Sequence, residues 1–126
     1  MGLVAHVFGK HGCAKCAVLR RRLDRALQDP RYAGVSVEYH DVLTLDGIVA
    51  FCKADTLNPN RIPALLMARD GRYVQSDAQF APPEDLSVYA PSCTFQHVGV
   101  QTDYDGPSRG VITEDMIRRT LDRALV

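Results

Sequence analysis

Two cysteines that are separated by two residues predict chemistry more clearly than any other feature of this chain. The sequence reads Cys13-Ala14-Lys15-Cys16 at this point. If the segment opens a helix, positions i and i+3 lie on one face, so the two sulfur atoms can approach bonding distance. Such a pair can form and break a disulfide, and it can also bind a zinc ion or an iron–sulfur cluster.

The elements around the two cysteines favour the redox interpretation. Residues 3–8 form a short, mostly apolar run that predicts a strand, and Gly9 and Gly12 mark a turn after it. Residues 13–28 carry apolar side chains at helical spacing, which predicts a helix that begins at the first cysteine. A Cys-x-x-Cys motif at a strand-to-helix junction in a β-α-β pattern is typical of thiol–disulfide exchange.

The start of a helix makes the two thiols chemically different. Its unpaired N–H groups and the positive end of its dipole favour a thiolate. Lys10, His11 and Lys15 add positive charge nearby. We therefore expect a lowered pKa for Cys13 and assign it as the nucleophile that attacks a substrate disulfide. Cys16 lies on the apolar stripe of the helix, and we expect it to be the buried, higher-pKa thiol that resolves the mixed disulfide.

The middle of the chain predicts one more strand and one more helix. Alternation over residues 35–40 predicts a strand with a polar side that includes a solvated His40. A helix is expected from about residue 44, and its predicted buried face consists of Leu45, Ile48, Val49 and Cys52. Cys52 is therefore interpreted as a small buried hydrophobic residue. His6, in the first strand, is interpreted as a core or edge histidine.

The later part predicts a central strand, a hairpin and a closing helix. The apolar run over residues 62–68 suits a strand buried on both faces, and Asp70-Gly71 predicts a hairpin turn after it. A helix capped by Thr113 is expected to close the chain. The order β-α-β-α-β-β-insert-α predicts a single α/β domain over residues 1–126, with an insert at about residues 76–110. Within that insert, Val98 and Val100 suggest an extra edge strand.

These features resemble the thioredoxin/glutaredoxin superfamily. Lys10, three residues before Cys13, is similar to glutaredoxins, whereas the run Arg61-Ile62-Pro63-Ala64-Leu65-Leu66-Met67 is similar to the proline loop and strand of thioredoxins. The resemblance implies a thioredoxin-like fold: a central mixed sheet with a parallel βαβ half, an antiparallel hairpin and flanking helices. It also implies that Pro63 is cis and faces the cysteines.

The resemblance implies a substrate-binding role for the proline loop. Proline lacks an N–H group, and the backbone of Ile62 beside it can pair with an extended substrate strand. We therefore expect Ile62 and Pro63, together with Lys10 and His11, to bind a disulfide-containing protein or a small thiol. Residues 76–79 stand where glutaredoxins carry a glycine pair that helps to hold glutathione, so no resident cofactor is expected and glutathione remains an alternative.

Two other functions remain open. Cys13 and Cys16 could hold zinc or an iron–sulfur cluster in a sensor or carrier, and Cys93 and His97 have a spacing that could complete a tetrahedral zinc site. A third interpretation is an interaction protein that works through residues 76–110.

Composition excludes several classes of protein. The chain has 126 residues, with 15 Lys and Arg against 15 Asp and Glu, and this balance argues against a nucleic-acid binder. No apolar run approaches the roughly 20 residues of a membrane span, so no membrane partner is expected. The start of the sequence does not resemble a signal peptide, and we expect a cytoplasmic protein whose thiols stay reduced.

Overall fold

The fold is described here from a computed structural model that covers residues 2–53, 62–74, 99–101 and 112–125. Each helix and strand begins and ends as follows: β1 (Leu3–Gly9), α1 (Ala14–Ala26), the short 3-10 helix η1 (Pro30–Tyr32), β2 (Val35–Asp41), α2 (Leu45–Lys53), β3 (Ala64–Arg69), β4 (Arg72–Tyr73), β5 (Gly99–Gln101) and α3 (Glu114–Leu125).

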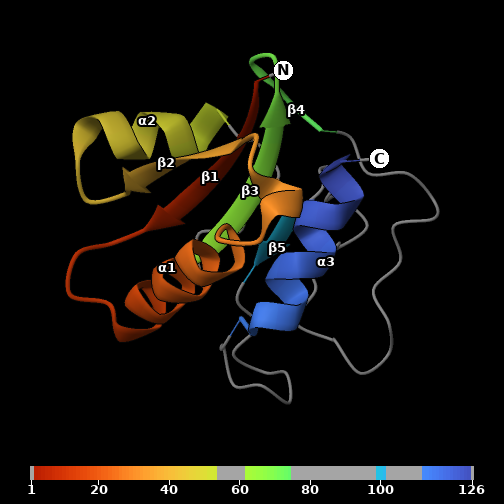
Figure 1. The fold of residues 1–126 in the computed structure, drawn as a ribbon. Coiled ribbons are helices and arrows are strands. Elements are labelled where there is room, and N and C mark those ends of the chain that lie inside the picture. Colours follow the sequence, from red (N-terminus) through yellow and green to blue (C-terminus); the bar gives the residue numbers. More distant parts are fainter. Residues whose placement is uncertain (1, 54–61, 75–98, 102–111, 126) are drawn as a thin grey trace.

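The strands form one mixed sheet in the order β2-β1-β3-β4 (Figure 1). β1 is parallel to β2 and antiparallel to β3, so β1 is hydrogen-bonded on both sides. The β1-α1-β2 half is parallel, and the β3–β4 hairpin is antiparallel. The predicted fold class is confirmed: an α/β fold with a central mixed sheet, a parallel βαβ half, an antiparallel hairpin and flanking helices.

Strand β5 joins the sheet from within the predicted insert. It pairs antiparallel with the first half of β3, where Leu65 faces Val100 and Leu66 faces Gly99, while β4 pairs with the second half. A side chain at Gly99 would collide with β3, because an ideal Cβ there lies 2.4 Å from the carbonyl oxygen of Leu65. The predicted edge strand is confirmed for residues 99–101, whereas Val98 lies outside the described residues.

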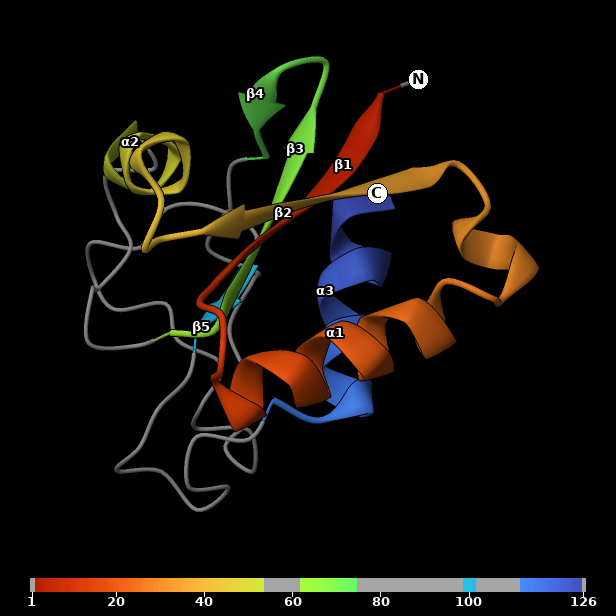
Figure 2. The same ribbon diagram turned by 90° about the vertical axis from the view of Figure 1, so that its left-hand side faces the viewer.

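The helices cover the two faces of the sheet unequally. Figure 2 shows α1 and α3 on one side of the sheet and α2 on the other. The larger hydrophobic cluster lies between the sheet and the helices α1 and α3; it includes Val7, Leu23, Met67, Ile117 and Leu121. The smaller cluster, of Phe8, Ala64 and Leu66, lies on the side of α2. β3 is therefore buried on both faces, as its apolar run predicted.

Helix α1 matches the predicted stripe but ends early. Its buried residues are Cys16, Leu19, Leu23 and Ala26. The helix ends at Ala26, and Asp29 then caps the 3-10 helix through a hydrogen bond from the N–H of Arg31. Asp29 and Pro30 thus start the next element after α1.

The predicted buried face of α2 is wrong. Leu45, Ile48 and Val49 are exposed, and so is Cys52, which was expected to be buried. Instead Gly47 is buried against the carbonyl of Asp41, and Ala50 and Phe51 contact the smaller cluster. The tight approach at Gly47 turns the helix so that Phe51 faces the sheet, and this rotation exposes the neighbouring stripe.

The predicted turn and cap are confirmed. Asp70 and Gly71 both have positive φ angles, 54° and 82°, as a two-residue hairpin turn requires. The hydroxyl of Thr113 accepts a hydrogen bond from the N–H of Met116 at the start of α3. None of the described helices combines the length and the apolar character needed to cross a bilayer.

Candidate functional site

Cys13 is the residue at which the loop after β1 becomes helix α1. Its backbone is extended, with φ −89° and ψ 117°, and its Sγ accepts a hydrogen bond from the N–H of Cys16 at 3.2 Å. The cysteine therefore occupies the N-cap position, where Ser or Asp more often satisfies a free N–H group. An N–H donor at a helix start stabilises negative charge on the sulfur atom that accepts from it.

Cys16 lies one turn deeper and is buried, with 2% of its surface exposed. Burial, followed by the hydrogen bond with Cys13, raises the pKa of the Cys16 thiol to about 12, although contacts with Lys10 act in the opposite direction. Cys16 is therefore a protonated thiol at neutral pH. Neither cysteine is in a disulfide, and Cys13 is partly accessible to solvent.

Gly9, at the end of β1, makes room for the buried cysteine. A Cβ atom at this position would lie 3.1 Å from Cys16 Sγ and 2.9 Å from the hydroxyl oxygen of Tyr39. Burial raises the pKa of Tyr39, so its hydroxyl stays protonated at neutral pH. Gly9 and Tyr39 belong to the site, and sequence reasoning missed both roles. The pairing of Gly9 with Asp41, two residues after Tyr39, follows from the parallel register and could have indicated them.

A shallow pocket of about 200 Å³ lies over the two cysteines. It brings together the sequence-predicted residues Lys10, His11, Cys13 and Cys16. Its other walls are Gly12, Ala17, Arg20, Tyr39 and Asp41. The guanidinium of Arg20 lies 5.0 Å from the centre of the Tyr39 ring, a distance typical of a cation–π contact. The pocket thus has a predominantly basic wall.

The proline loop lies at the same end of the sheet but does not line this pocket. The Ile62–Pro63 peptide bond is cis, as the family resemblance implied, and Pro63 is buried. Pro63 comes directly before Ala64, which pairs with Phe8, and Gly9 follows directly after Phe8. Ile62 and Pro63 are thus near the end of β1 from which the cysteine loop departs.

The predicted four-ligand zinc site cannot be placed, because Cys93 and His97 lie outside the described residues. Within residues 2–53, 62–74, 99–101 and 112–125, no third histidine, cysteine or acidic side chain joins Cys13 and Cys16 in a group of metal-binding size.

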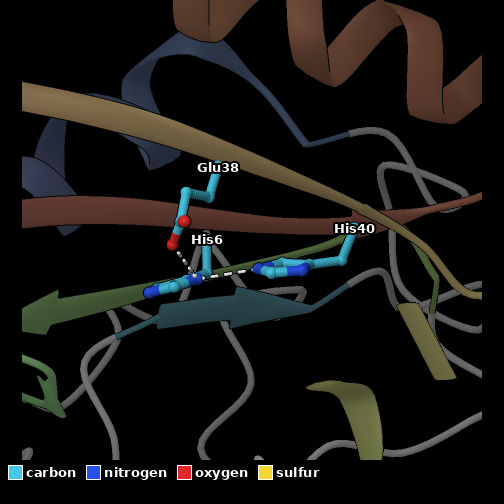
Figure 3. A group of neighbouring side chains, drawn as sticks. All are labelled: His6, Glu38 and His40. Carbon is cyan, nitrogen blue, oxygen red and sulfur yellow. Dashed lines mark hydrogen bonds and ion pairs between the residues drawn. The ribbon is translucent and has the colours of Figure 1, made fainter. Parts of the chain in front are cut away.

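A second group of polar side chains lies on the side of the sheet that α2 covers. Figure 3 shows His6, from β1, between Glu38 and His40, from β2. His6 Nδ1 lies 2.8 Å from His40 Nε2 and 3.4 Å from Glu38 Oε2. Burial is the main cause that lowers the pKa of both histidines, while Glu38 acts in the opposite direction. Both rings are therefore neutral at pH 7.

The structure corrects the interpretation of His40 as a solvated residue. Its ring is half-buried and lies nearly parallel to that of Phe8, with centroids 4.9 Å apart. His6 is half-buried, as expected for a core or edge position. Parallel pairing of the two predicted strands places His6 beside Glu38 and Phe8 beside His40, so the register was the signal that could have revealed the group.

Comparison with known proteins gives a likeness of fold. The chain matches no family model and no curated protein sequence. A solved structure described as that of a malarial protein aligns over all of both chains, with a TM-score of 0.52 and 8% identity. Mitochondrial thioredoxin 3 from Saccharomyces cerevisiae, in its oxidized form, aligns over 56% of this chain and 59% of its own, with a TM-score of 0.42 and 20% identity.

Proposed function

We propose that this protein is a thiol–disulfide oxidoreductase that uses Cys13 as nucleophile and Cys16 as resolving thiol. The observation that carries this proposal is the hydrogen bond from the Cys16 N–H to Cys13 Sγ at the start of α1, with the second thiol buried one turn deeper. This arrangement separates a partly exposed sulfur from a protected one, and two-step disulfide exchange needs both.

The exchange proceeds in two balanced steps. The Cys13 thiolate attacks one sulfur of a substrate disulfide, forms a mixed disulfide and releases the other sulfur as a thiolate. Cys16 then gives up its proton to the thiolate released first and attacks Cys13 Sγ, which breaks the mixed disulfide and releases the second substrate sulfur as a thiolate that takes a proton from water. The substrate gains two electrons and leaves as a dithiol, while the Cys13–Cys16 disulfide holds the oxidising equivalents until an external thiol reduces it.

The pocket suits this reaction better than storage of a large cofactor. Its volume of about 200 Å³ is below the roughly 300 Å³ at which typical small-molecule pockets begin. A disulfide with its flanking carbon atoms can approach Cys13 in this pocket, which Lys10 and His11 also line. We propose that Ile62 and Pro63, at the same end of the sheet, bind the backbone of a substrate protein or small thiol.

The basic wall gives the pocket a preference among substrates. Lys10 and Arg20 are side chains with positive charge, and Asp41 is the one acidic side chain among the described residues that line the pocket. Disulfides flanked by acidic residues should therefore react faster than those flanked by basic ones, and added salt should reduce the difference. A protein whose Cys13 and Cys16 work as reduced thiols suits a reducing compartment such as the cytoplasm.

The decisive experiment uses insulin reduction and trapping of mixed disulfides. The wild-type chain should accelerate insulin reduction by dithiothreitol, and Cys13→Ser should abolish that acceleration. Cys16→Ser should accumulate a covalent adduct with the disulfide substrate, and a reducing agent should release it. Cys52→Ser, which changes an exposed cysteine away from the pocket, is the matched control and should behave like the wild type. A folded Cys16→Ser protein that forms no adduct with any disulfide would overturn the proposal.

A further inference from the structure

The group formed by His6, Glu38 and His40 has the composition of a metal site and lies away from the cysteines. Its three donor atoms are two imidazole nitrogens and one carboxylate oxygen, and they all lie within 4.8 Å of one another. They come from adjacent parallel strands, where His6 pairs with Glu38 in the β1–β2 register. We propose that these three side chains bind one divalent transition-metal ion, and that Zn²⁺ is the ion they fit best.

Two of the distances between the donor atoms lie close to the spacing of ligands around tetrahedral zinc. Zinc bonds of about 2.0–2.1 Å at tetrahedral angles place neighbouring ligand atoms about 3.3 Å apart. His6 Nδ1 lies 2.8 Å from His40 Nε2 and 3.4 Å from Glu38 Oε2, so the two observed distances lie on either side of that value. The third separation, between the donor atoms of Glu38 and His40, is within 4.8 Å, so the exposed Glu38 side chain and the His40 ring must move closer to tetrahedral spacing as the ion binds.

With both rings neutral, a single hydrogen atom lies between the donor atoms of this group. If His6 Nδ1 carries the hydrogen, that one hydrogen must serve both His40 Nε2 and the Glu38 carboxylate. If His40 Nε2 carries it instead, the carboxylate faces a lone pair of His6. A cation between the three atoms accepts a lone pair from each of them, so metal binding resolves a conflict that neither tautomer removes.

The rings are held in place before any ion arrives. His40 lies against Phe8 at 4.9 Å, and Tyr73 contacts the His6 ring edge-on at 5.5 Å. The two imidazole planes differ by only 14°, and His6 Nδ1 lies 2.8 Å from His40 Nε2, so both rings present a nitrogen atom to the same space between the strands. A preorganised pair of imidazoles reduces the entropy that metal binding would otherwise cost.

The same three residues line a pocket of about 380 Å³. Three protein ligands leave a fourth coordination position, which in zinc proteins is taken by water or by a small ligand. Lys53 and Tyr73 also line this pocket, so an anionic or hydroxyl-bearing ligand on the metal would find polar partners there. Imidazole donors favour zinc and its neighbours over Mg²⁺ and Ca²⁺, which prefer oxygen.

Zinc titration of the 126-residue chain tests this proposal separately from the redox function. Isothermal titration should be done on Cys13→Ser/Cys16→Ser, because that variant removes any site built on those thiols. One equivalent of Zn²⁺ should bind per chain. Glu38→Gln keeps the size of an exposed side chain and should weaken binding at least as much as the roughly 10- to 100-fold seen when an outer-shell partner is lost. Asp24→Asn, which changes an exposed acid on α1, is the control and should leave binding unchanged.

Spectroscopy keeps the result interpretable if a histidine variant folds poorly. Co²⁺ added to Cys13→Ser/Cys16→Ser should give ligand-field bands without a sulfur-to-cobalt charge-transfer band, and Zn²⁺ should shift the imidazole NMR signals of His6 and His40. His40→Gln, checked for folding by circular dichroism, should remove these signals. The proposal is wrong if the double cysteine variant binds no zinc, if Glu38→Gln binds it as tightly as its parent, or if a sulfur-to-cobalt band accompanies binding.

Discussion

Cys13 and Cys16 differ because one helical turn separates a helix start from the hydrophobic core. Cys13 takes the N-cap position and accepts the N–H of Cys16, whereas Cys16 itself lies on the stripe that packs against the sheet. Gly9 permits this depth, because any larger residue there would meet the Cys16 sulfur. The chemical asymmetry of the two thiols therefore depends on a residue that carries no functional group.

The raised pKa of Cys16 predicts that the reduced protein loses stability in alkaline solution. The folded state holds the thiol proton up to a pKa of about 12, against an ordinary value of 9.0. This contribution is complete below about pH 9 and is lost as the pH rises toward 12, with a slope of at most about 1.4 kcal/mol per pH unit. Urea unfolding of the reduced wild-type chain across this range should show the loss.

Cys16→Ser is the control for that experiment. Burial also raises the pKa of Tyr32, Tyr39 and Tyr73, so part of the alkaline loss will remain in the variant. The difference between the two proteins isolates the thiol. Parallel curves from pH 9 to 12 would show that Cys16 titrates as it does in the unfolded chain.

Gly9→Ala should destabilise the protein and impair the site together. Its methyl group would lie within about 3 Å of the Tyr39 hydroxyl and Cys16 Sγ, and overpacking of this kind costs about 1–3 kcal/mol. Gly34→Ala is the matched control, because a Cβ there meets no atom within 4 Å; its free energy of unfolding should stay within about 0.5 kcal/mol. Equal effects of the two substitutions on chemical denaturation would contradict the packing described here.

At the level of single residues, sequence reasoning identified the two cysteines by their chemical type and spacing. It missed residues whose role depends on where the fold places them. The Cys-x-x-Cys spacing and the apolar stripe predicted, without any structure, that Cys13 lies at a helix start and that Cys16 is buried. Gly9, Tyr39 and the approach of His6 to His40 depend on which strands pair and in which register. Those contacts join residues about 30 positions apart in the chain, and local periodicity does not encode them.

Among the elements, strand β5 brings residues of the predicted insert into the sheet, where they pair with β3. It pairs with the first half of β3, directly after the cis Ile62–Pro63 bond, and Val100 is fully buried in the larger cluster. The backbone approach at Gly99 is closer than any side chain allows. Pairing therefore requires a glycine at this position of the strand.

Gly99→Ala should detach β5 from β3. The added Cβ would lie 2.4 Å from the carbonyl oxygen of Leu65 and 2.7 Å from a methyl carbon of Leu66, so the strands must separate. Amide hydrogen exchange should speed up at Leu65 and Val100, and stability should fall by at least about 1–3 kcal/mol. Unchanged exchange at both amides, with Gly34→Ala as reference, would show that β5 does not pair as described.

Hydrophobic periodicity predicted the buried face of one helix, α1, but not that of α2. The stripe of α1 identified its buried face, because this helix packs along much of its length on the sheet and on α3. Helix α2 is short and carries apolar residues on several sides, so its periodicity allowed two orientations. The contact between Gly47 and the carbonyl of Asp41 selects the orientation that exposes Ile48 and Val49.

In the whole molecule, the sheet separates two groups of reactive side chains. Cys13 and Cys16 belong to α1, which packs with α3 on one face, whereas His6 and His40 lie on the face that α2 covers. Tyr32 ties η1 to α3 on the first of these faces. Its side chain is buried, and its hydroxyl donates a hydrogen bond to Asp122 of α3 at 2.7 Å. Substitutions in one group should therefore leave the other intact.

The helices on the two faces of the sheet, α1 and α3 on one and α2 on the other, should contribute unequally to the free energy of unfolding. Leu121→Ala removes a fully buried side chain between α3 and the sheet and should cost about 2–5 kcal/mol. Ile48→Ala, on the exposed face of α2, should change the free energy of unfolding by no more than about 0.5 kcal/mol. Chemical denaturation measures both. A loss from Ile48→Ala comparable with that from Leu121→Ala would mean that the predicted apolar face of α2 is buried after all.

The central claim is that Cys13 and Cys16 form a reversible redox pair, and a redox titration with peptide mass mapping tests it most directly. The chain is equilibrated in buffers of graded reduced and oxidised glutathione, its free thiols are alkylated after acid quenching, and each cysteine peptide is measured. We predict one two-electron transition in which Cys13 and Cys16 become linked while Cys52 stays free. Independent oxidation of the two cysteines, or linkage of Cys13 to any other cysteine, would contradict the mechanism.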